Sequence, residues 1–288
     1  MQARPGPLTE TTAARVRALA AEATAADGVP PLGEQALLDL ADPGAPVRHV
    51  VADDAYAWLD LRGRPTAELV VAPSARRQGL GRALLAAVRA AALDEAGELP
   101  LVWAHGNLPG ARALAHSARL TVRRELWQLS RDLDPADLPP MPPAPRGVAV
   151  REFVPGSDDE AWLGLNARAF AHHPEQGRMT AVDLTARQAE PWFRADDLLL
   201  AERDGRLLAF VWLKVEPGED VGELYVLGVD PTAQGLGLGR LLTAMTLHQL
   251  AARGLRRVLL YTEADNTVAV RTYASAGFVR SRVDVQYG

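Results

Sequence analysis

Apolar residues in the second half of the chain gather in short runs, as β-strands require. Leu198–Arg203 and Leu207–Val215 are two such runs, and the Asp204-Gly205 pair between them predicts a tight hairpin. Glu223–Val229 has the pattern of a further strand. Val258–Thr262 is mostly apolar without alternation, which is typical of a strand buried on both faces. These segments predict a β-sheet.

Other segments repeat apolar residues at helical spacing. Gly239–Arg253 is one of them, and Gly254 stands at its end, where a left-handed residue commonly closes a helix. Asn266–Ala276 predicts another helix. Glu34–Leu40 and Asp158–Ala171 also have helical patterns. Helices that alternate with strands predict an α/β fold with a mixed sheet.

A segment of the first half recurs in the second half. Val71–Arg82 and Val229–Arg240 align without a gap at an offset of 158 residues, and they share a Val, a Pro, an Ala, two Gly and the final Arg. Further along, Asn107–Arg112 resembles Asn266–Arg271. Similar segments in the same order predict two copies of one domain.

A proline-dense stretch separates the copies. Asp134–Gly147 cannot join a helix or a central strand and favours an extended linker. We therefore predict an N-terminal domain over residues 1–138, a linker over 139–147 and a C-terminal domain over 148–288.

Composition narrows the classes of function. A net charge of -5 argues against a general nucleic-acid binder, because a phosphate backbone requires a basic face. The absence of cysteine removes disulfides, thiolate metal sites and cysteine nucleophiles. No apolar run approaches the ~20 residues that span a bilayer, and the N-terminus lacks a signal-peptide pattern. We expect a cytoplasmic monomer that binds small molecules and neither nucleic acid, membrane nor metal.

Each copy contains a glycine-rich loop between a predicted strand and a helix, at Arg76–Gly81 and at Gln234–Gly239. Glycine lets the backbone turn sharply and approach a ligand. Loop amides and a helix N-terminus then favour an anion, and a pyrophosphate suits such a nest. One such loop could be a simple tight turn, but two copies with the same flanking residues favour a binding function.

The spacing of this loop, Gln/Arg-x-x-Gly-x-Gly, is neither the dinucleotide fingerprint nor the P-loop. It resembles the CoA pyrophosphate loop of the GNAT acetyltransferases. The helix Asn266–Arg271 and the closing segment Tyr273–Phe278 also resemble that superfamily. The resemblance implies acetyl-CoA as acetyl donor and two tandem GNAT domains. Each would have a mixed, mostly antiparallel sheet with flanking helices, in which strands four and five splay to admit CoA.

Two residues are candidates for proton transfer. Acetyl transfer to an amine requires a base for the amine and an acid for the departing thiolate. The resemblance places Glu223 on strand four, where bases of the superfamily occur, and Tyr273 on the helix beside the cleft. Backbone amides of Leu227–Val229 would polarise the acetyl carbonyl. Alternatively, Glu223 is an exposed strand residue and Tyr273 a packing aromatic.

The first copy lacks both groups. Pro65 stands at the position of Glu223, and Leu114 at that of Tyr273. Glu68 is close, but its spacing differs. The first half is therefore expected to perform no chemistry, while Arg76 and Arg77 leave CoA binding open; alternatively, they form a solvated basic turn.

Longer segments resemble the mycothiol synthase family of tandem GNAT enzymes. They are Pro31–Gln35, Phe170–Gly177, Gly222–Pro231 and Leu260–Tyr273, and the resemblance covers nearly the whole chain. It implies acetylation of the cysteinyl amine of cysteinyl-glucosaminyl-inositol. Acetylation of another amine, such as an aminoglycoside or a protein N-terminus, and a non-catalytic acyl-CoA sensor are the alternatives.

The resemblance also implies the site residues. The substrate contacts would be Glu34, Glu175, Lys214, Glu223 and Tyr261. The CoA contacts would be Leu69, Val70, Val71, Arg76, Arg77, Gln78, Gly79, Leu80 and Gly81 in the first half, and Leu227, Gly228, Val229, Gln234, Gly235, Leu236, Gly237, Leu238, Gly239, Arg240, Asn266, Thr267, Val268, Ala269, Val270 and Arg271 in the second. The second loop departs from the family, because Gly235 and Leu236 stand where arginines are usual, so CoA binding is expected to depend on Arg240 and Arg271.

Overall fold

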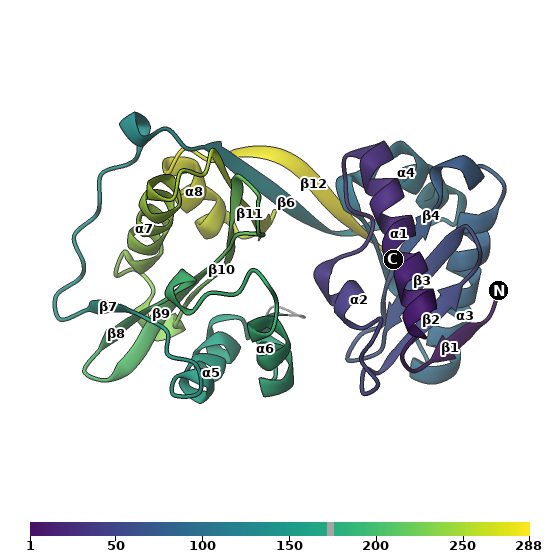
Figure 1. Cartoon of the computed structure of the whole chain (residues 1–288), viewed down its shortest axis with the longest axis horizontal. Helices are drawn as coiled ribbons and strands as arrows, with labels where there is room; N and C mark the ends of the chain where they lie inside the picture. The colour runs from purple at the N-terminus through teal and green to yellow at the C-terminus, as the bar shows by residue number, and fades with distance from the viewer. Residues whose placement is uncertain (172–175) are drawn as a thin grey trace. The chain divides into compact units, whose positions relative to one another are not determined.

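A computed structural model describes residues 1–171 and 176–288 and is drawn in Figure 1. It divides into two compact units. The first comprises Met1–Leu126 together with Arg282–Gly288, and the second comprises Trp127–Ser281. Each unit is described by itself.

The sheet of the first unit is mixed and mostly antiparallel. Its strands are β1 (Ala3–Pro5), β2 (Val47–Val51), β3 (Ala55–Asp60), β4 (Thr66–Val71), β5 (Leu101–Ala104) and the last part of β12 (Val279–Tyr287), in the order β1-β2-β3-β4-β5-β12. Only the β4–β5 pair is parallel among them, and its register holds for Thr66↔Leu101 and Ala67↔Val102. Beyond these pairs β4 and β5 separate, as predicted for strands four and five.

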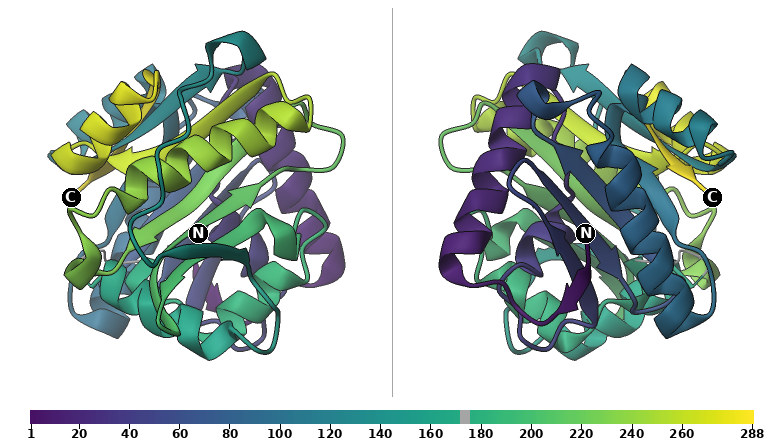
Figure 2. Two further views of the ribbon diagram at one scale, coloured as in Figure 1. Left: turned by 90° about the vertical axis from the view of Figure 1, so that its left-hand side faces the viewer. Right: turned by 90° about the vertical axis from the view of Figure 1, so that its right-hand side faces the viewer.

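Helices cover both faces of this sheet (Figure 2, right). They are α1 (Glu10–Asp27), α2 (Glu34–Leu38), α3 (Leu80–Ala96) and α4 (Pro109–Ser117). One core packs α1 and α2 against Tyr56, Trp58 and Val70. The other packs α3 against the opposite face, including Ala57 and Leu59. Alternate residues of β3 thus enter different cores, because side chains of a strand point to opposite faces in turn.

The second unit repeats this architecture. Its strands are the later part of β6 (Val122–Asp132), β7 (Ala149–Glu152), β8 (Leu198–Arg203), β9 (Arg206–Lys214), β10 (Val221–Val229) and β11 (Arg257–Glu263), in the order β6-β11-β10-β9-β8-β7. The β10–β11 pair is parallel, and the pairs from β10 to β7 are antiparallel. Asp204 and Gly205 have φ of 53° and 74°, which confirms the tight hairpin between β8 and β9.

Four helices flank the second sheet: α5 (Asp159–Ala169), α6 (Ala181–Gln188), α7 (Leu238–Ala252) and α8 (Thr267–Ser275). One core joins α7 and α8 to one face, and the other joins α5 and α6 to the opposite face. The long α7 crosses the strands in the left view of Figure 2. Gly254 follows it with a φ of 81°, which confirms the predicted left-handed end.

The boundaries of the units differ from those of the predicted domains at both ends of the C-terminal domain, 148–288. The last seven residues belong to the first unit, because β12 pairs with β5 through Val285↔Ala104, Gln286↔Trp103 and Tyr287↔Val102. The proline-rich stretch belongs to the second unit, where His248 Nε2 lies 2.9 Å from the carbonyl oxygen of Pro139. These pairings join residues more than a hundred positions apart, so composition along the chain did not reveal them.

Within the described residues, no helix has both the length and the apolar character that a bilayer crossing would require.

Candidate active site

Strands β10 and β11 separate beside the predicted site. Their parallel register runs from Val221↔Arg257 to Leu224↔Leu260. After Leu224, β10 continues to Val229 while β11 continues to Glu263, with no further registered pair between them. Among the residues that the structure describes, Val226–Val229 therefore have a ladder partner only on β9. The edge turned away from β9 can offer amides to an extended ligand, as the GNAT resemblance requires.

A β-bulge lies where the separation begins. The register between β10 and β9 shifts between Leu224 and Val226, which leaves Tyr225 as the extra residue. A bulge reverses which alternate residues face each side of a sheet. Before the bulge, Glu223 lies opposite Lys214; after it, Val226 lies opposite Trp212. Lys214 and Trp212 point to the same face of β9, so Val226 shares the face of Glu223. Leu227 and Val229 consequently pack toward the α7 core, on the other face from Glu223.

Three predicted substrate residues share one face of this sheet. Glu223 on β10 is directly opposite Lys214 on β9 and pairs with Leu259 on β11. Tyr261 follows Leu259 by two positions and so lies on the same face. It is 36% exposed, and its hydroxyl accepts a hydrogen bond of 2.8 Å from Gln128 Nε2. Strand register thus brings together residues that are up to 47 positions apart in the sequence.

Lys214, the only lysine of the sequence, lies on an aromatic surface. Its Nζ lies 4.8 Å from the ring centre of Trp192 and 5.7 Å from that of Tyr225. Nζ also forms an ion pair of 3.1 Å with Glu216, and only 15% of the side chain is exposed. Cation–π contacts of this kind hold an ammonium group in place without neutralising it. Sequence analysis did not identify Trp192 and Tyr225, because aromatic residues in such patterns usually belong to a core.

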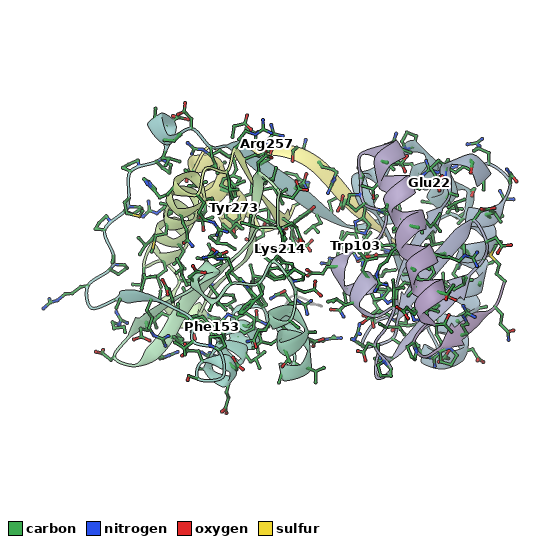
Figure 3. All side chains as sticks on the ribbon, viewed as in Figure 1. Glu22, Trp103, Phe153, Lys214, Arg257 and Tyr273 are labelled. Atoms are coloured by element: carbon green, nitrogen blue, oxygen red, sulfur yellow. The ribbon has the colours of Figure 1, made fainter. Side chains whose placement is uncertain are left out.

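Tyr273 belongs to α8 and packs with α7 residues in the core on the opposite face of the sheet; Figure 3 labels it. It is 7% exposed, and its ring packs edge-on against Phe278 with 5.8 Å between ring centres. Its hydroxyl forms no hydrogen bond within residues 1–171 and 176–288. Burial raises the pKa of Tyr273 above its ordinary value of about 10. The phenol therefore stays protonated at neutral pH, as a proton donor must.

The glycine-rich loop follows β10 directly. A 3₁₀ turn over Pro231–Ala233 leads into it, and α7 begins after Gly237. Gly235 and Gly237 have φ of 83° and 84°, a region that residues with a Cβ rarely adopt. No side chain caps the first turn of α7. Its backbone amides and its helix dipole are therefore available to an anion.

Asp230 organises this loop, although sequence analysis did not single it out. It is 1% exposed and accepts hydrogen bonds from the amide and hydroxyl of Thr232, at 2.9 and 2.6 Å, and from Arg168 Nε at 2.9 Å. Burial alone would raise the pKa of Asp230, but these bonds outweigh burial and hold the pKa well below its usual range. The Asp-Pro-Thr sequence was the available signal, since Asp before such a turn commonly binds the backbone two residues on.

Two arginines that the resemblance assigns to CoA, Arg240 and Arg271, have no anionic partner in the described chain. Arg240 Nη2 lies 3.6 Å from the position that a Cβ would occupy at Gly237. Arg240 and Arg271 are both exposed. The side chain of Asn266 caps α8 by accepting a hydrogen bond of 3.1 Å from the amide of Ala269. The remaining predicted contacts, Thr267 to Val270, form the first turn of α8.

The first unit contains a second cradle. Leu69–Val71 end β4, and the loop then passes through Arg77, with φ of 65°, and Gly79, with φ of 88°, into α3. Arg76 has partners within the first unit. It donates two hydrogen bonds of 2.8 and 2.7 Å to the Asp27 carboxylate and a third to the Val71 carbonyl. Arg77 is exposed and has no such partner among the residues that the structure describes.

Two predicted substrate residues remain. Glu34 is the first residue of α2 in the first unit. Glu175 lies outside the described residues. In the described ranges, no group of three or more His, Cys, Asp or Glu side chains has an arrangement that could hold a metal ion.

Family models match both units. The "Acetyltransferase (GNAT) family" matches residues 166–278, and an "Acetyltransferase (GNAT) domain" matches residues 45–117. The second match contains the Glu68 and Arg76–Gly81 region, and the first contains Glu223 and Tyr273. Both halves are therefore GNAT domains.

Relatives match over nearly the full length. A mycothiol acetyltransferase of Cellulomonas flavigena is 54% identical over 98% of this chain and 87% of its own length. One from Sanguibacter keddieii is 53% identical over 97% of this chain and 94% of its own length. Among solved structures, a GCN5-related N-acetyltransferase from Sphaerobacter thermophilus has a TM-score of 0.71 at 25% identity, covering 99% of this chain and 94% of its own. A tandem GNAT protein from the clavulanic acid biosynthesis pathway has a TM-score of 0.72 at 20% identity, covering 99% and 98%. The latter similarity shows the fold alone.

Proposed function

Because the chain belongs to the mycothiol acetyltransferase family and is an acetyltransferase, we propose that it acetylates the cysteinyl amine of cysteinyl-glucosaminyl-inositol, with acetyl-CoA as donor, to give mycothiol. We further propose that the second unit performs the chemistry. One observation carries this proposal. Where β10 and β11 separate, Glu223 lies on one face of the sheet, and Tyr273 lies in the core on the opposite face.

The arrangement supplies an acid and a base from opposite sides. A thioester between the two strands would meet the amine on the Glu223 face and Tyr273 on the α7–α8 face. The amine nitrogen forms a bond to the acetyl carbon while its proton passes to Glu223, directly or through water. The carbon–sulfur bond then breaks, and the departing thiolate takes the proton of Tyr273. Amides of residues 227–229 stabilise the oxyanion formed between these steps.

The base is needed only for the fraction of the substrate amine that is protonated. An α-amino group has a pKa of about 7.7–8.0, so a large part of it is already neutral near pH 8. Below that pH the ammonium form dominates, and Glu223 must remove the proton. Lys214 lies opposite Glu223 and is held by aromatic rings, so it can direct hydroxyl groups of the substrate.

We propose that the glycine-rich loop of the second unit, Gln234–Gly239, holds the CoA diphosphate. The left-handed Gly235 and Gly237 turn the loop around the anion, and the first turn of α7 presents uncapped amides. Arg240 and Arg271 would supply the positive charge that the loop itself lacks. Leu227, Gly228 and Val229 would bind the pantetheine arm through the free edge of β10. The residues therefore fit acetyl-CoA.

The first unit is proposed to bind a CoA diphosphate without catalysis. Its loop has the same left-handed residues, which supports binding. Pro65 and Leu114 stand in place of the base and the acid, which supports the lack of chemistry. A cytoplasmic location and a monomeric state remain predictions.

Incubation with acetyl-CoA and a panel of amines tests the function. The panel contains the cysteinyl pseudo-disaccharide, an aminoglycoside and a peptide N-terminus, and mass spectrometry measures the acetylated product. Saturable turnover of the cysteinyl pseudo-disaccharide alone is expected. Preference for another amine would overturn the substrate, and acetyl-CoA binding without turnover of any amine would indicate a sensor.

A further inference from the structure

The first unit contains a buried carboxylate–imidazole–carboxylate cluster that the proposed reaction does not use. Glu68 on β4 lies 3.2 Å from His105 Nε2, and Asp284 on β12 lies 3.1 Å from His105 Nδ1. Asp284 also accepts a hydrogen bond of 2.6 Å from the amide of Gly106. Glu68 and Asp284 are 6% and 3% exposed. Groups buried in this way have fixed positions, because a charge in the interior is stable only beside its partners.

His105 is the charged centre of this cluster. Burial alone would lower the pKa of His105, but Glu68 and Asp284 outweigh burial and raise the pKa to about 10. The imidazolium holds the pKa of Asp284 below its usual range despite burial. His105 and Asp284 therefore keep their charges over the whole physiological pH range, which suits a rigid support better than a proton relay.

Glu68 connects the cluster to the start of α2. The amide of Gly33 donates a hydrogen bond of 2.6 Å to Glu68 Oε2. Gly33 is the residue before α2, and no side chain caps this helix. A Cβ at Gly33 would lie 3.1 Å from Glu68 Oε1, so the close approach favours glycine. The Glu68 carboxylate thus fixes the residue from which α2 begins.

A second buried carboxylate holds the other end of α2. Asp39 follows the helix and is 1% exposed. It accepts hydrogen bonds from Trp58 Nε1 at 3.0 Å, from Arg62 at 3.0 and 2.6 Å, and from Gln35 Nε2 at 2.9 Å. A helix of five residues is not stable by itself. Its orientation therefore depends on Glu68 at one end and Asp39 at the other.

We infer that Glu68, supported by His105 and Asp284, is a positioning residue that fixes Glu34, the first residue of α2, for binding of the amine substrate. This inference rests on the proposed function and on the family resemblance, which implies that Glu34 contacts the substrate. Glu68 does not contact the reacting atoms. It acts through the amide of Gly33, the residue directly before Glu34.

Steady-state kinetics of the full-length enzyme test the inference. Glu68→Ala is expected to raise the KM for the amine about tenfold and to leave the KM for acetyl-CoA and kcat unchanged. Glu68→Gln should recover most of the loss, because its carbonyl oxygen can still accept from Gly33. Glu95→Ala is the matched control, since it removes a carboxylate that is ion-paired with Arg48 in the same unit and lies on α3, on the other face of the sheet from α2. It should leave the amine KM unchanged.

A double-variant cycle separates positioning from general damage. If Glu68 acts through Glu34, Glu68→Ala should cause no further rise of the amine KM in a Glu34→Gln background. Additive effects, or an equal change in the KM for acetyl-CoA, would overturn the inference.

A readout without turnover keeps the two proposals apart. In the full chain, the Gly33 amide should be protected from hydrogen exchange, and Glu68→Gln should reduce this protection less than Glu68→Ala. Unchanged protection in both variants would overturn the role of Glu68 whatever the substrate. Failure of the wild-type enzyme to acetylate the cysteinyl amine, with Gly33 protection lost as expected, would instead overturn the proposed function.

Discussion

The two glycine-rich loops have the same backbone but different side chains. Arg77 and Gly235 occupy equivalent positions, and both have a positive φ, of 65° and 83°. The next equivalent pair, Gly79 and Gly237, has φ of 88° and 84°. An arginine that keeps a left-handed conformation indicates that the surrounding fold imposes the turn. The shape of the cradle is thus retained where its sequence has changed.

The side chains around the two loops differ at the positions of the carboxylate that organises the loop and of the proposed acid. Asp230 organises the second loop through Thr232, whereas the equivalent Ala72 has no side chain that could do so. Leu114 stands in place of Tyr273 and lies 3.5 Å from the Cβ position of Gly81. The first copy therefore presents a methyl group on the side where the second copy has a phenol.

The separation of the central strands also has different consequences in the two units. In the first unit, Glu68 on β4 reaches His105, which follows β5, and their ion pair connects the separated strands. In the second unit, Glu223 lies on β10 just before its register with β11 ends. The same strand arrangement therefore has a buried, ion-paired carboxylate in the first unit and the proposed base in the second.

Replacing the base should produce the largest difference between the copies. We expect Glu223→Gln to lower kcat/KM by roughly 1000-fold near pH 6.5, within the usual range for general bases. The loss should shrink above pH 8, because the amine, with a pKa of about 7.7–8.0, is then largely neutral without help. A pH–rate profile measures this. A loss that stays constant with pH would contradict the assigned role.

Pro65→Glu in the Glu223→Gln background is the corresponding control. It places a carboxylate at the equivalent position of the first unit, where no phenol lies opposite. Activity should not return, and recovered turnover would contradict the assignment of chemistry to the second unit alone.

Replacing the acid should have the next largest effect. Tyr273→Phe is expected to lower kcat about 100-fold and to leave the KM for acetyl-CoA unchanged, because only the proton of the hydroxyl is lost. Since burial raises the pKa of Tyr273, wild-type kcat should show no loss from phenol ionisation up to pH 10. Tyr287→Phe is the matched control: its hydroxyl donates to Asn107 in the first unit, so kcat should not change. Full activity of Tyr273→Phe would remove this residue from the mechanism.

The equivalent arginines should differ by a smaller factor. Arg240→Ala is expected to raise the KM for acetyl-CoA about tenfold, because one charged contact to a phosphate is worth roughly 1.4 kcal/mol or more. Arg82→Ala removes the equivalent residue of the first unit and should leave turnover unchanged. Initial rates over a range of acetyl-CoA concentrations measure both. Similar effects from the two variants would mean that the first cradle contributes to catalysis.

The smallest expected effect concerns the strained position of the loop. Gly235→Arg and Gly235→Ala should both destabilise the protein by about 1 kcal/mol, because each introduces a Cβ at a left-handed residue. Thermal unfolding measures this cost. The Arg variant should have a lower KM for acetyl-CoA than the Ala variant, since it adds a cation beside the diphosphate. Equal KM values would indicate that residue 235 lies away from the phosphates.

Much of the second unit could be predicted from its sequence. The hairpin of β8 and β9, the strand before the loop, and helices α7 and α8 follow from periodicity and from glycine at defined positions. Helices α1 and α6 were not predicted. Helix α1 is rich in alanine and threonine and buries only small side chains with Val16, so its apolar face is weak in the sequence. The second unit's Asp230 network also escaped prediction, because its partner Arg168 lies 62 positions earlier.

The sequence by itself determined that the chain has two related halves, that each has a glycine-rich loop between a strand and a helix, and that only the second has a candidate acid and base. These are local features, since glycine positions and residue identity do not depend on distant contacts. Tertiary structure decided which faces the side chains occupy: a bulge at Tyr225 sets the orientation beyond Glu223, and the exchange of β12 into the first unit brings Asp284 to His105. Both depend on hydrogen bonds between strands far apart in the chain, which no local pattern encodes.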